Sequence, residues 1–195
     1  MLMRNPSSAR GSSTAPPDEA TLLGRVATEE VEAFEILYRL YHPRLTRFIE
    51  RLTRRSGMVE EVLDDTMMVV WRKAHTYNHQ AKPSTWIFAI AYRQTLKALR
   101  HQDEAVEFDQ LEHALGVEPG PEAELQQRET RERLVDAMGE LSLEHRAVIE
   151  LTYYLGYACR EVAAVMDCPV DTVKTRMFYA RRKLKTLLGE RREAL

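Results

Sequence analysis

The chain has 195 residues, 44% of them hydrophobic and 30% charged, which fits a soluble globular protein with one or two domains. No segment approaches the roughly 20 apolar residues that a membrane-spanning helix needs, and the N-terminus lacks the apolar core of a secretory signal, so we expect a cytoplasmic location. The net charge of −2 conceals an uneven distribution, because residues 101–130 carry nine acidic and one basic side chain, whereas residues 172–195 carry eight basic and two acidic ones.

The first 24 residues are rich in Pro, Ser, Gly and Ala, and this composition predicts a disordered tail. From Val31 to Leu52, apolar residues recur in steps of three and four, which predicts a helix with one buried face. Pro43 should kink this helix or split it in two. Residues 25–100 as a whole are expected to form a first helical domain.

The next two helices of this domain are predicted from their caps and their apolar periodicity. Ser56 is expected to cap a helix whose apolar face lies opposite a cluster of carboxylates, and Ser84 is expected to cap the helix after it. The apolar face contains Val59, Val62, Leu63, Met67, Val70 and Trp71. The opposite face contains Glu60, Glu61, Asp64 and Asp65.

Residues 101–127 are acidic and include the stretch "EPGP", which cannot continue a helix. We interpret this segment as a linker between two domains, because a loop of such length inside one compact domain is uncommon. A long loop within a single domain is the alternative. The predicted fold is therefore all-α, with two small helical domains joined by an acidic linker.

Residues 128–190 are predicted to form the second domain. It begins with a polar helix, followed by the apolar stretch "LSLEHRAVIELTYYLG", in which Ser142 provides a cap and Gly156 a stop. Tyr153 and Tyr154 in this stretch are expected to pack inside the domain.

The last part of the chain has the pattern of a helix-turn-helix unit. A short helix over residues 160–166 is followed by the turn "DCPV" and by a long basic helix from Val170 to Leu188. Two helices joined by a tight turn, with the second one basic, are typical of DNA-binding proteins. Cys159 and Cys168 lack the spacing of a metal site and are expected to be ordinary buried or half-buried thiols.

The long basic helix has one face for packing and one face that can meet DNA. The packing face contains Val173, Met177, Ala180, Leu184 and Leu187. The outward face contains Thr172, Lys174, Thr175, Arg176, Tyr179, Arg182 and Lys183. In the major groove, Arg or Lys can bind guanine acceptors and a Thr methyl can meet a thymine methyl, while the later cations contact phosphates. A solvated amphipathic helix is the alternative.

Two stretches of the chain resemble one known family. The stretch "LSLEHRAVIELTYYLGYACREVAAVMDCPVDTVKTRMFYARRKL" resembles the C-terminal domain of extracytoplasmic-function sigma factors. The stretch "VEEVLDDTMMVVWRKAHTYNHQAKPSTWIFAIAYRQTLKALR" resembles the N-terminal domain of the same family, with its acidic helix ending in Trp and its Trp-apolar-x-x-Ile-Ala helix. The likeness covers roughly residues 25–100 and 130–188, and both motifs in this order are more specific than either alone.

This resemblance implies a dissociable subunit of bacterial RNA polymerase that selects promoters. The acidic helix would bind the clamp coiled coil of the largest polymerase subunit through Glu61, Asp64, Asp65, Met67 and Met68. The segment after it would melt the −10 element and hold the single strand, which needs base stacking and backbone charge. The candidates there are Tyr77, Asn78, His79, Lys82, Ser84, Thr85, Phe88, Tyr92 and Arg93. The seven outward residues of the C-terminal helix would read the −35 element.

Two aromatic positions of the first domain have competing interpretations. Trp86 lies in register with Ile90, which favours a place in the core over a stacking platform. His79 is either a base contact or a polar loop residue. The chain departs from the family pattern at Tyr92, Arg93, Lys97, Ala158, Met177, Phe178 and Tyr179. These positions fall on or beside the proposed reading residues, so the promoter sequence is not predicted.

The leading interpretation is a sigma factor that acts with core RNA polymerase on promoter DNA in a stress or environmental response. The resemblance implies that an anti-sigma factor, which can itself be membrane-bound, holds it inactive. The alternative is a helix-turn-helix regulator that binds DNA without polymerase, which leaves residues 58–93 without a task. The sequence contains no nucleophile beside a base and no Gly-rich phosphate loop, so we expect no enzyme, no metal and no cofactor.

Overall fold

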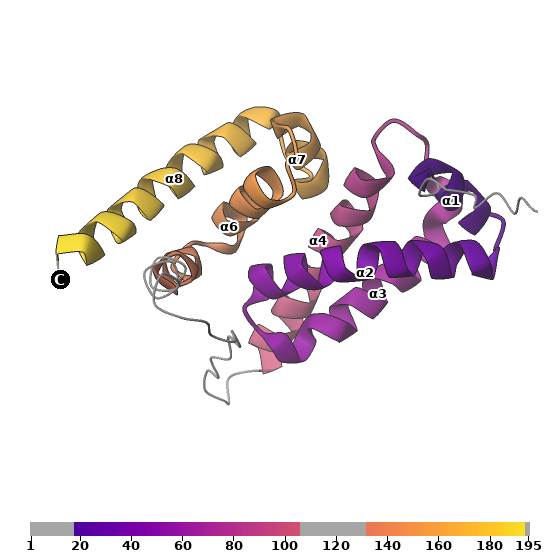
Figure 1. Ribbon diagram of the computed structural model, residues 1–195, viewed down its shortest axis with the longest axis horizontal. Helices are drawn as coiled ribbons and strands as arrows, with labels where there is room; N and C mark the ends of the chain where they lie inside the picture. Colours follow the sequence, from indigo (N-terminus) through magenta and orange to yellow (C-terminus); the bar gives the residue numbers. More distant parts are fainter. Residues whose placement is uncertain (1–17, 106–131, 194–195) are drawn as a thin grey trace, which may run out of the picture.

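The computed structural model describes residues 18–105 and 132–193, and every regular element in these two ranges is helical. The predicted all-α fold with two helical domains is confirmed (Figure 1). Most of the predicted tail and of the predicted acidic linker lies outside the described residues. Within them, no helix is both long enough and apolar enough to cross a membrane.

The N-terminal domain begins earlier in the chain than the composition suggested. Helix α1 spans Glu19–Val26, and its N-cap Asp18 accepts a hydrogen bond from the backbone N–H of Thr21 at 3.0 Å. Leu22 and Leu23 in this helix are fully buried. The prediction of a disordered tail is therefore wrong over its last residues, because this apolar pair anchors the helix to the domain core.

Helix α2 (Val31–Thr53) passes through Pro43 as one helix, so the predicted split does not occur. Pro43 lies on the exposed side of α2, where a carbonyl that lost its intrahelical partner can bond water instead. On the opposite side, Tyr41 and Leu45 are fully buried and hold the helix against the core. Val31 was expected on the buried face but is 59% exposed.

Both predicted serine caps in the N-terminal domain are wrong. Ser56 opens a short 3₁₀ turn, η1 (Ser56–Met58), whose last residue is the N-cap of α3 (Val59–Lys73). Helix α4 (Pro83–Ala105) begins one residue before Ser84. Proline is favoured at a first helical position, because the N–H it lacks has no intrahelical partner there. The end of α4 lies beyond the predicted domain boundary at residue 100.

The C-terminal domain matches its predicted elements closely. A helix over residues 132–139 precedes α6 (Leu143–Ile149), the π-helical turn η3 (Glu150–Tyr154), α7 (Cys159–Met166) and α8 (Val170–Glu193). Ser142 Oγ accepts from the backbone N–H of His145 at 3.3 Å and Gly156 has a φ of +71°, so the predicted cap and stop are confirmed. Both cysteines are unpaired and half-buried, as expected.

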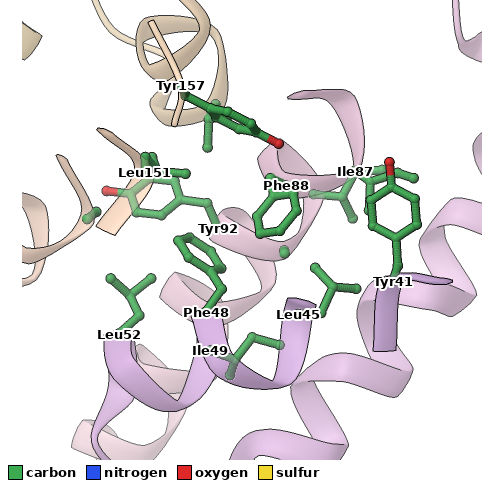
Figure 2. Close-up of a cluster of buried hydrophobic side chains, with 14 of the residues drawn as sticks. Tyr41, Leu45, Phe48, Ile49, Leu52, Ile87, Phe88, Tyr92, Leu151 and Tyr157 are labelled. Carbon is green, nitrogen blue, oxygen red and sulfur yellow. The ribbon is translucent and has the colours of Figure 1, made fainter. Parts of the chain in front are cut away.

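The two domains share an apolar interface, in which α4 lies against α7. Figure 2 shows side chains of α2 and α4 gathered with Leu151 and Tyr157 of the C-terminal domain. The ring of Phe88 on α4 stands edge-on to Phe48 of α2, with centroids 5.2 Å apart, and edge-on to Tyr157, with centroids 5.9 Å apart. Phe88 therefore belongs to the core of its own domain and to the contact between domains.

Candidate interfaces for polymerase and DNA

The outer face of α3 carries five exposed residues that we call the acidic surface. They are Glu60, Glu61, Asp64, Asp65 and Met68. Met68 is 44% exposed, so an apolar side chain stands among the carboxylates. The hydroxyl of Tyr38 on α2 donates to Asp64 Oδ1 at 3.1 Å and fixes this edge of the surface. Beside it lies a shallow groove of about 370 Å³, lined by Met58, Glu61, Asp65, Gln94, Lys97, Ala98 and His101.

Met67, one of the five predicted polymerase contacts, is only 1% exposed, so its side chain is not part of the surface that α3 offers. Successive residues of an α-helix point about 100° apart, so Met67 turns into the core beside Leu63 while Met68 faces outward. Glu61, Asp64 and Asp65 are exposed, as a docking surface requires. The acidic surface can therefore offer carboxylates and one methionine to a basic, partly apolar partner.

The predicted −10 residues fall into an exposed set and a buried set. The exposed set is Asn78, His79, Lys82 and Arg93. Asn78, His79 and Lys82 belong to the loop between the 3₁₀ turn η2 (Ala74–Thr76) and α4, whereas Arg93 lies further along α4. The half-buried Tyr77 supports this loop, since its hydroxyl donates to the Ala81 carbonyl at 2.6 Å and its ring lies 5.8 Å from Trp86 and 4.6 Å from His79. Trp86 is half-buried and packs on Tyr77, whereas both interpretations of His79 stay open.

Four predicted −10 residues are buried in this arrangement, and we call them the covered face of α4. Ser84, Thr85, Phe88 and Tyr92 are 8%, 2%, 0% and 4% exposed. Burial raises the pKa of Tyr92 to about 12, because the phenolate loses its solvation there. These side chains are not accessible to bases in this arrangement, and their role at the −10 element stays a prediction. Arg93, one position further, points to solvent.

The predicted DNA-reading face of α8 lies at the surface. Lys174, Thr175, Tyr179, Arg182 and Lys183 are exposed, and Thr172 and Arg176 are half-buried. The predicted packing face is also confirmed: Val173, Met177 and Ala180 are buried, and Leu184 and Leu187 are half-buried.

Three cations of this face have local partners that orient them. Lys174 Nζ donates to Asp171 Oδ1 at 2.9 Å, and this contact raises the pKa of Lys174. Arg176 Nη1 donates to Cys168 Sγ at 3.7 Å, so the turn before α8 steadies the guanidinium. Lys183 donates to the Glu140 carbonyl. All three are held by weak contacts that phosphates or bases could replace.

Three exposed aromatic residues were not predicted as surface features. Phe178 is 61% exposed and stands edge-on to Tyr179, with ring centroids 5.4 Å apart. Its place one step after the inward Met177 is the sequence signal that could have found it. Tyr153 and Tyr154 are 57% and 50% exposed, so their predicted burial is wrong. The π-helical turn that contains them shifts the helical phase, which α-helical periodicity does not foresee.

Two family descriptions match the chain in the order of its two domains. Residues 37–105 match sigma-70 region 2, and residues 131–184 match sigma-70 region 4. An extracytoplasmic-function (ECF) RNA polymerase sigma factor, SigK of Mycobacterium sp. strain KMS, is 32% identical over 88% of this chain and 91% of its own length. The chain belongs to the ECF sigma factors of the sigma-70 family. It is a sigma factor, a regulatory protein that directs RNA polymerase to promoter DNA.

Other relatives of this sigma factor span most of both chains. The ECF sigma factor SigL of Mycobacterium tuberculosis (strain H37Rv) is 28% identical over 84% of this chain and 93% of its own. RpoE of Cereibacter sphaeroides is 30% identical over 78% and 84%. Among solved structures, CnrH in complex with the cytosolic domain of CnrY has a TM-score of 0.66, 23% identity, and coverage of 88% and 97%. RpoE in complex with the anti-sigma factor NepR from Bartonella quintana has a TM-score of 0.66, 24% identity, and coverage of 80% and 96%. These two structures share the fold of this sigma factor.

Proposed function

We propose that this sigma factor binds polymerase and promoter DNA through three separate surfaces. The acidic surface of α3 binds core RNA polymerase, the start of α4 with the loop before it holds the melted −10 strand, and α8 reads the −35 element. The observation that carries the proposal is the cationic outward face of α8, in a domain that matches sigma-70 region 4 and follows a domain that matches region 2.

The −35 surface has the chemistry of major-groove recognition. Arg176 lies near the start of α8, where a recognition helix reaches base edges and an arginine can bind two acceptors of guanine. Thr175 is exposed and can place its methyl group against thymine. Arg182 lies further along the helix and can contact phosphates, which gives affinity and salt dependence rather than sequence preference. We add the exposed Phe178 to this surface, because it can also meet a thymine methyl.

The −10 surface combines a folded loop with exposed cations. Lys82 and Arg93 can neutralise backbone phosphates, and Asn78 can donate to a base edge. Stacking in a single-strand site needs aromatic side chains. Of the aromatic candidates, Tyr77 and His79 lie in the loop before α4, whereas Phe88 and Tyr92 lie on the covered face. Two of the four aromatic candidates are therefore enclosed in this arrangement of the domains.

The acidic surface suits a helical partner that is basic and partly apolar. Asp64 and Asp65 would face its cations, and Met68 would pack against its apolar side chains. The family resemblance points to the clamp coiled coil of the largest polymerase subunit as this partner. The sigma factor would act in the cytoplasm, where the polymerase works.

We also propose regulation by an anti-sigma factor. The solved RpoE of similar fold is in complex with the anti-sigma factor NepR. In the present chain the acidic surface and the outward face of α8 are both exposed, and a partner that covered either one would prevent transcription. Co-purification of a protein that leaves after a stress signal would support this, and a sigma factor that is always free and active in unstressed cells would contradict it.

Reconstituted transcription tests the proposed function directly. The purified chain is added to bacterial core RNA polymerase with genomic DNA, and the 5′ ends of the transcripts are aligned. We expect a shared −35 and −10 pattern that is absent without the chain, and whose −35 part changes in Arg176→Glu. A chain that binds duplex DNA tightly but neither binds core polymerase nor changes its start sites would contradict the proposal and favour a polymerase-independent regulator.

A further inference from the structure

The outward face of α8 includes an acidic side chain close to its start. Asp171 lies in the first turn of this helix, and its side chain is 90% exposed. The residues predicted to read the −35 element all carry a cation or a hydroxyl group, and Asp171 is not among them. We propose that Asp171 is a specificity-determining residue, whose carboxylate accepts a hydrogen bond from the amino group of a cytosine in the −35 element. This inference rests on the proposed function of α8.

Helical spacing places Asp171 in a row of exposed side chains. Residues three or four positions apart lie on the same side of an α-helix. The row that begins with Asp171 continues through Thr175, Phe178 and Arg182, and all four residues are exposed. The fully buried Val173 lies on the opposite side of the helix. Asp171 is therefore the first member of a row that faces away from the domain core.

The start of this row is the end that would reach the bases. In a recognition helix the N-terminal residues contact base edges, whereas Arg182 at the far end of the row is proposed to contact phosphates. A carboxylate gains nothing from the phosphate backbone, because the two charges repel each other. At a base edge, however, it can accept from the N4 amino group of cytosine. The base pair opposite Asp171 therefore decides whether its charge favours or opposes binding.

Lys174 stands beside Asp171 and has the complementary chemistry. Its Nζ donates to Asp171 Oδ1 at 2.9 Å, and this hydrogen bond raises the pKa of Lys174. The two side chains thus present a donor group and an acceptor group next to each other. A G·C pair offers the matching order in the major groove, with the N7 and O6 acceptors of guanine beside the amino donor of cytosine. Lys174 would bind the guanine while Asp171 binds the cytosine paired with it.

An A·T pair fits the same two side chains less well. The amino group of adenine lies between two acceptors, its own N7 and the O4 of thymine. A carboxylate placed over this amino group therefore lies near both acceptors, and Lys174 can neutralise one of them at most. The thymine methyl group also occupies part of this edge. We expect Asp171 and Lys174 together to favour a G·C pair at one position of the −35 element.

A purely structural role of Asp171 is the competing explanation. The positive end of the helix dipole favours an aspartate in the first turn, and a lysine three residues later supports the helix. Both effects act on the folding of α8 and do not depend on the promoter sequence. The pair is exposed, so it contributes little to stability and can rearrange around a base at little cost. Base preference is therefore the property that separates the two roles.

A promoter library tests the proposal in the complete transcription system. The parent chain or Asp171→Ala is combined with core RNA polymerase on promoters that carry every base at each −35 position, and barcodes in the transcripts are counted. We expect the parent to prefer G·C over A·T by roughly tenfold at one position, and Asp171→Ala to lose most of this preference while the other positions keep theirs. An unchanged profile, or the loss of a preference for A·T instead, would overturn the proposal.

Asp167→Asn is the matched control for the change in net charge. Asp167 is exposed in the turn before α8 and has a φ of +51°, which asparagine tolerates. We expect this variant to keep every base preference of the parent. Loss of the same G·C preference in Asp167→Asn would show that overall charge, and not a contact of Asp171, produces the effect. Both variants should have the helix content of the parent by circular dichroism, because both side chains are exposed.

Lys174→Ala tests whether the two side chains read one base pair. We expect Lys174→Ala to weaken the same G·C preference, at the same position, as Asp171→Ala. Preferences that change at two different positions would overturn the shared reading. A parent chain without any −35 preference would mean that the proposed function of α8 fails, and this inference with it. A parent with clear −35 preferences that Asp171→Ala leaves intact would overturn this inference alone.

Discussion

The acidic surface of α3 and the covered face of α4 belong to the same domain but differ in what reaches them. Asp64, Asp65 and Met68 on α3 face solvent, whereas Phe88 and Tyr92 on α4 are closed in by the C-terminal domain. On the proposed function, the free chain presents its polymerase surface to solvent while these two −10 candidates are enclosed. Polymerase binding and −10 binding should respond differently to the same change in domain contact.

The largest expected effect is on the free energy of unfolding. It should differ between the two faces, because the covered face of α4 is buried and the acidic surface of α3 is not. Phe88→Ala should lower the free energy of unfolding by about 3–5 kcal/mol, as truncation of a fully buried Phe does. Met68→Ala on the acidic surface should change it by less than about 0.5 kcal/mol. Urea unfolding of both variants measures this. Similar small losses for both would mean that Phe88 is not enclosed in solution.

A reversal of charge on the acidic surface should affect polymerase alone. Asp64→Lys with Asp65→Lys should weaken binding to core polymerase by about 2–3 kcal/mol, because like charges would then face each other. The scattering profile of the free chain should not change, since both side chains face solvent. Fluorescence anisotropy with labelled sigma factor gives the affinity. Unchanged affinity would remove α3 from the polymerase interface.

A smaller effect on DNA binding is expected at the −35 surface. Phe178 on α8 belongs neither to the acidic surface of α3 nor to the covered face of α4. Phe178→Ala should weaken binding of the holoenzyme to promoter DNA by about 1 kcal/mol if the ring meets a thymine methyl. The loss should disappear on a promoter whose −35 thymines are replaced by uracils, which lack that methyl group. A loss of the same size on both promoters would show that the ring acts through packing instead.

The smallest expected effect is a change in pH dependence at the domain contact. Glu150 has a raised pKa because burial outweighs the attraction of Arg51 and Arg146. A carboxyl with a raised folded-state pKa binds more protons in the folded than in the unfolded chain, so its contribution to stability is lost as the pH rises above its ordinary value of 4.5. Glu150→Gln should therefore gain stability relative to the parent between pH 5 and 7. Urea midpoints that run parallel over this range would contradict the assignment.

The sequence predicted what periodicity within one helix can show. In α8 the inward Val173 and the outward Lys174 both lie where the pattern placed them. In α3 the same reasoning should have separated Met67 from Met68, but the family resemblance assigned both to one surface. Resemblance tells which positions match the family, but it does not tell which side of the helix each residue faces.

The features that the sequence could not predict depend on contacts between distant residues or on irregular backbone turns. No local pattern of residues encodes either of these. The covered face of α4 is enclosed partly by Tyr157, which lies in another domain and far along the chain. The exposure of Tyr153 follows from a π-helical turn rather than from an α-helix. Pro43 lies within a continuous helix because burial on the other side of α2 compensates for one missing hydrogen bond.

The most direct test measures the distance between the two domains in the free and the working protein. In a cysteine-free background, donor and acceptor dyes are placed at Arg39→Cys on α2 and Ala164→Cys on α7, both exposed and outside the proposed binding surfaces. We predict efficient energy transfer in the free sigma factor and a large fall in transfer when core polymerase and promoter DNA are added together. Transfer that stays the same in the promoter complex would contradict the proposed function, in which the two domains hold separate promoter elements.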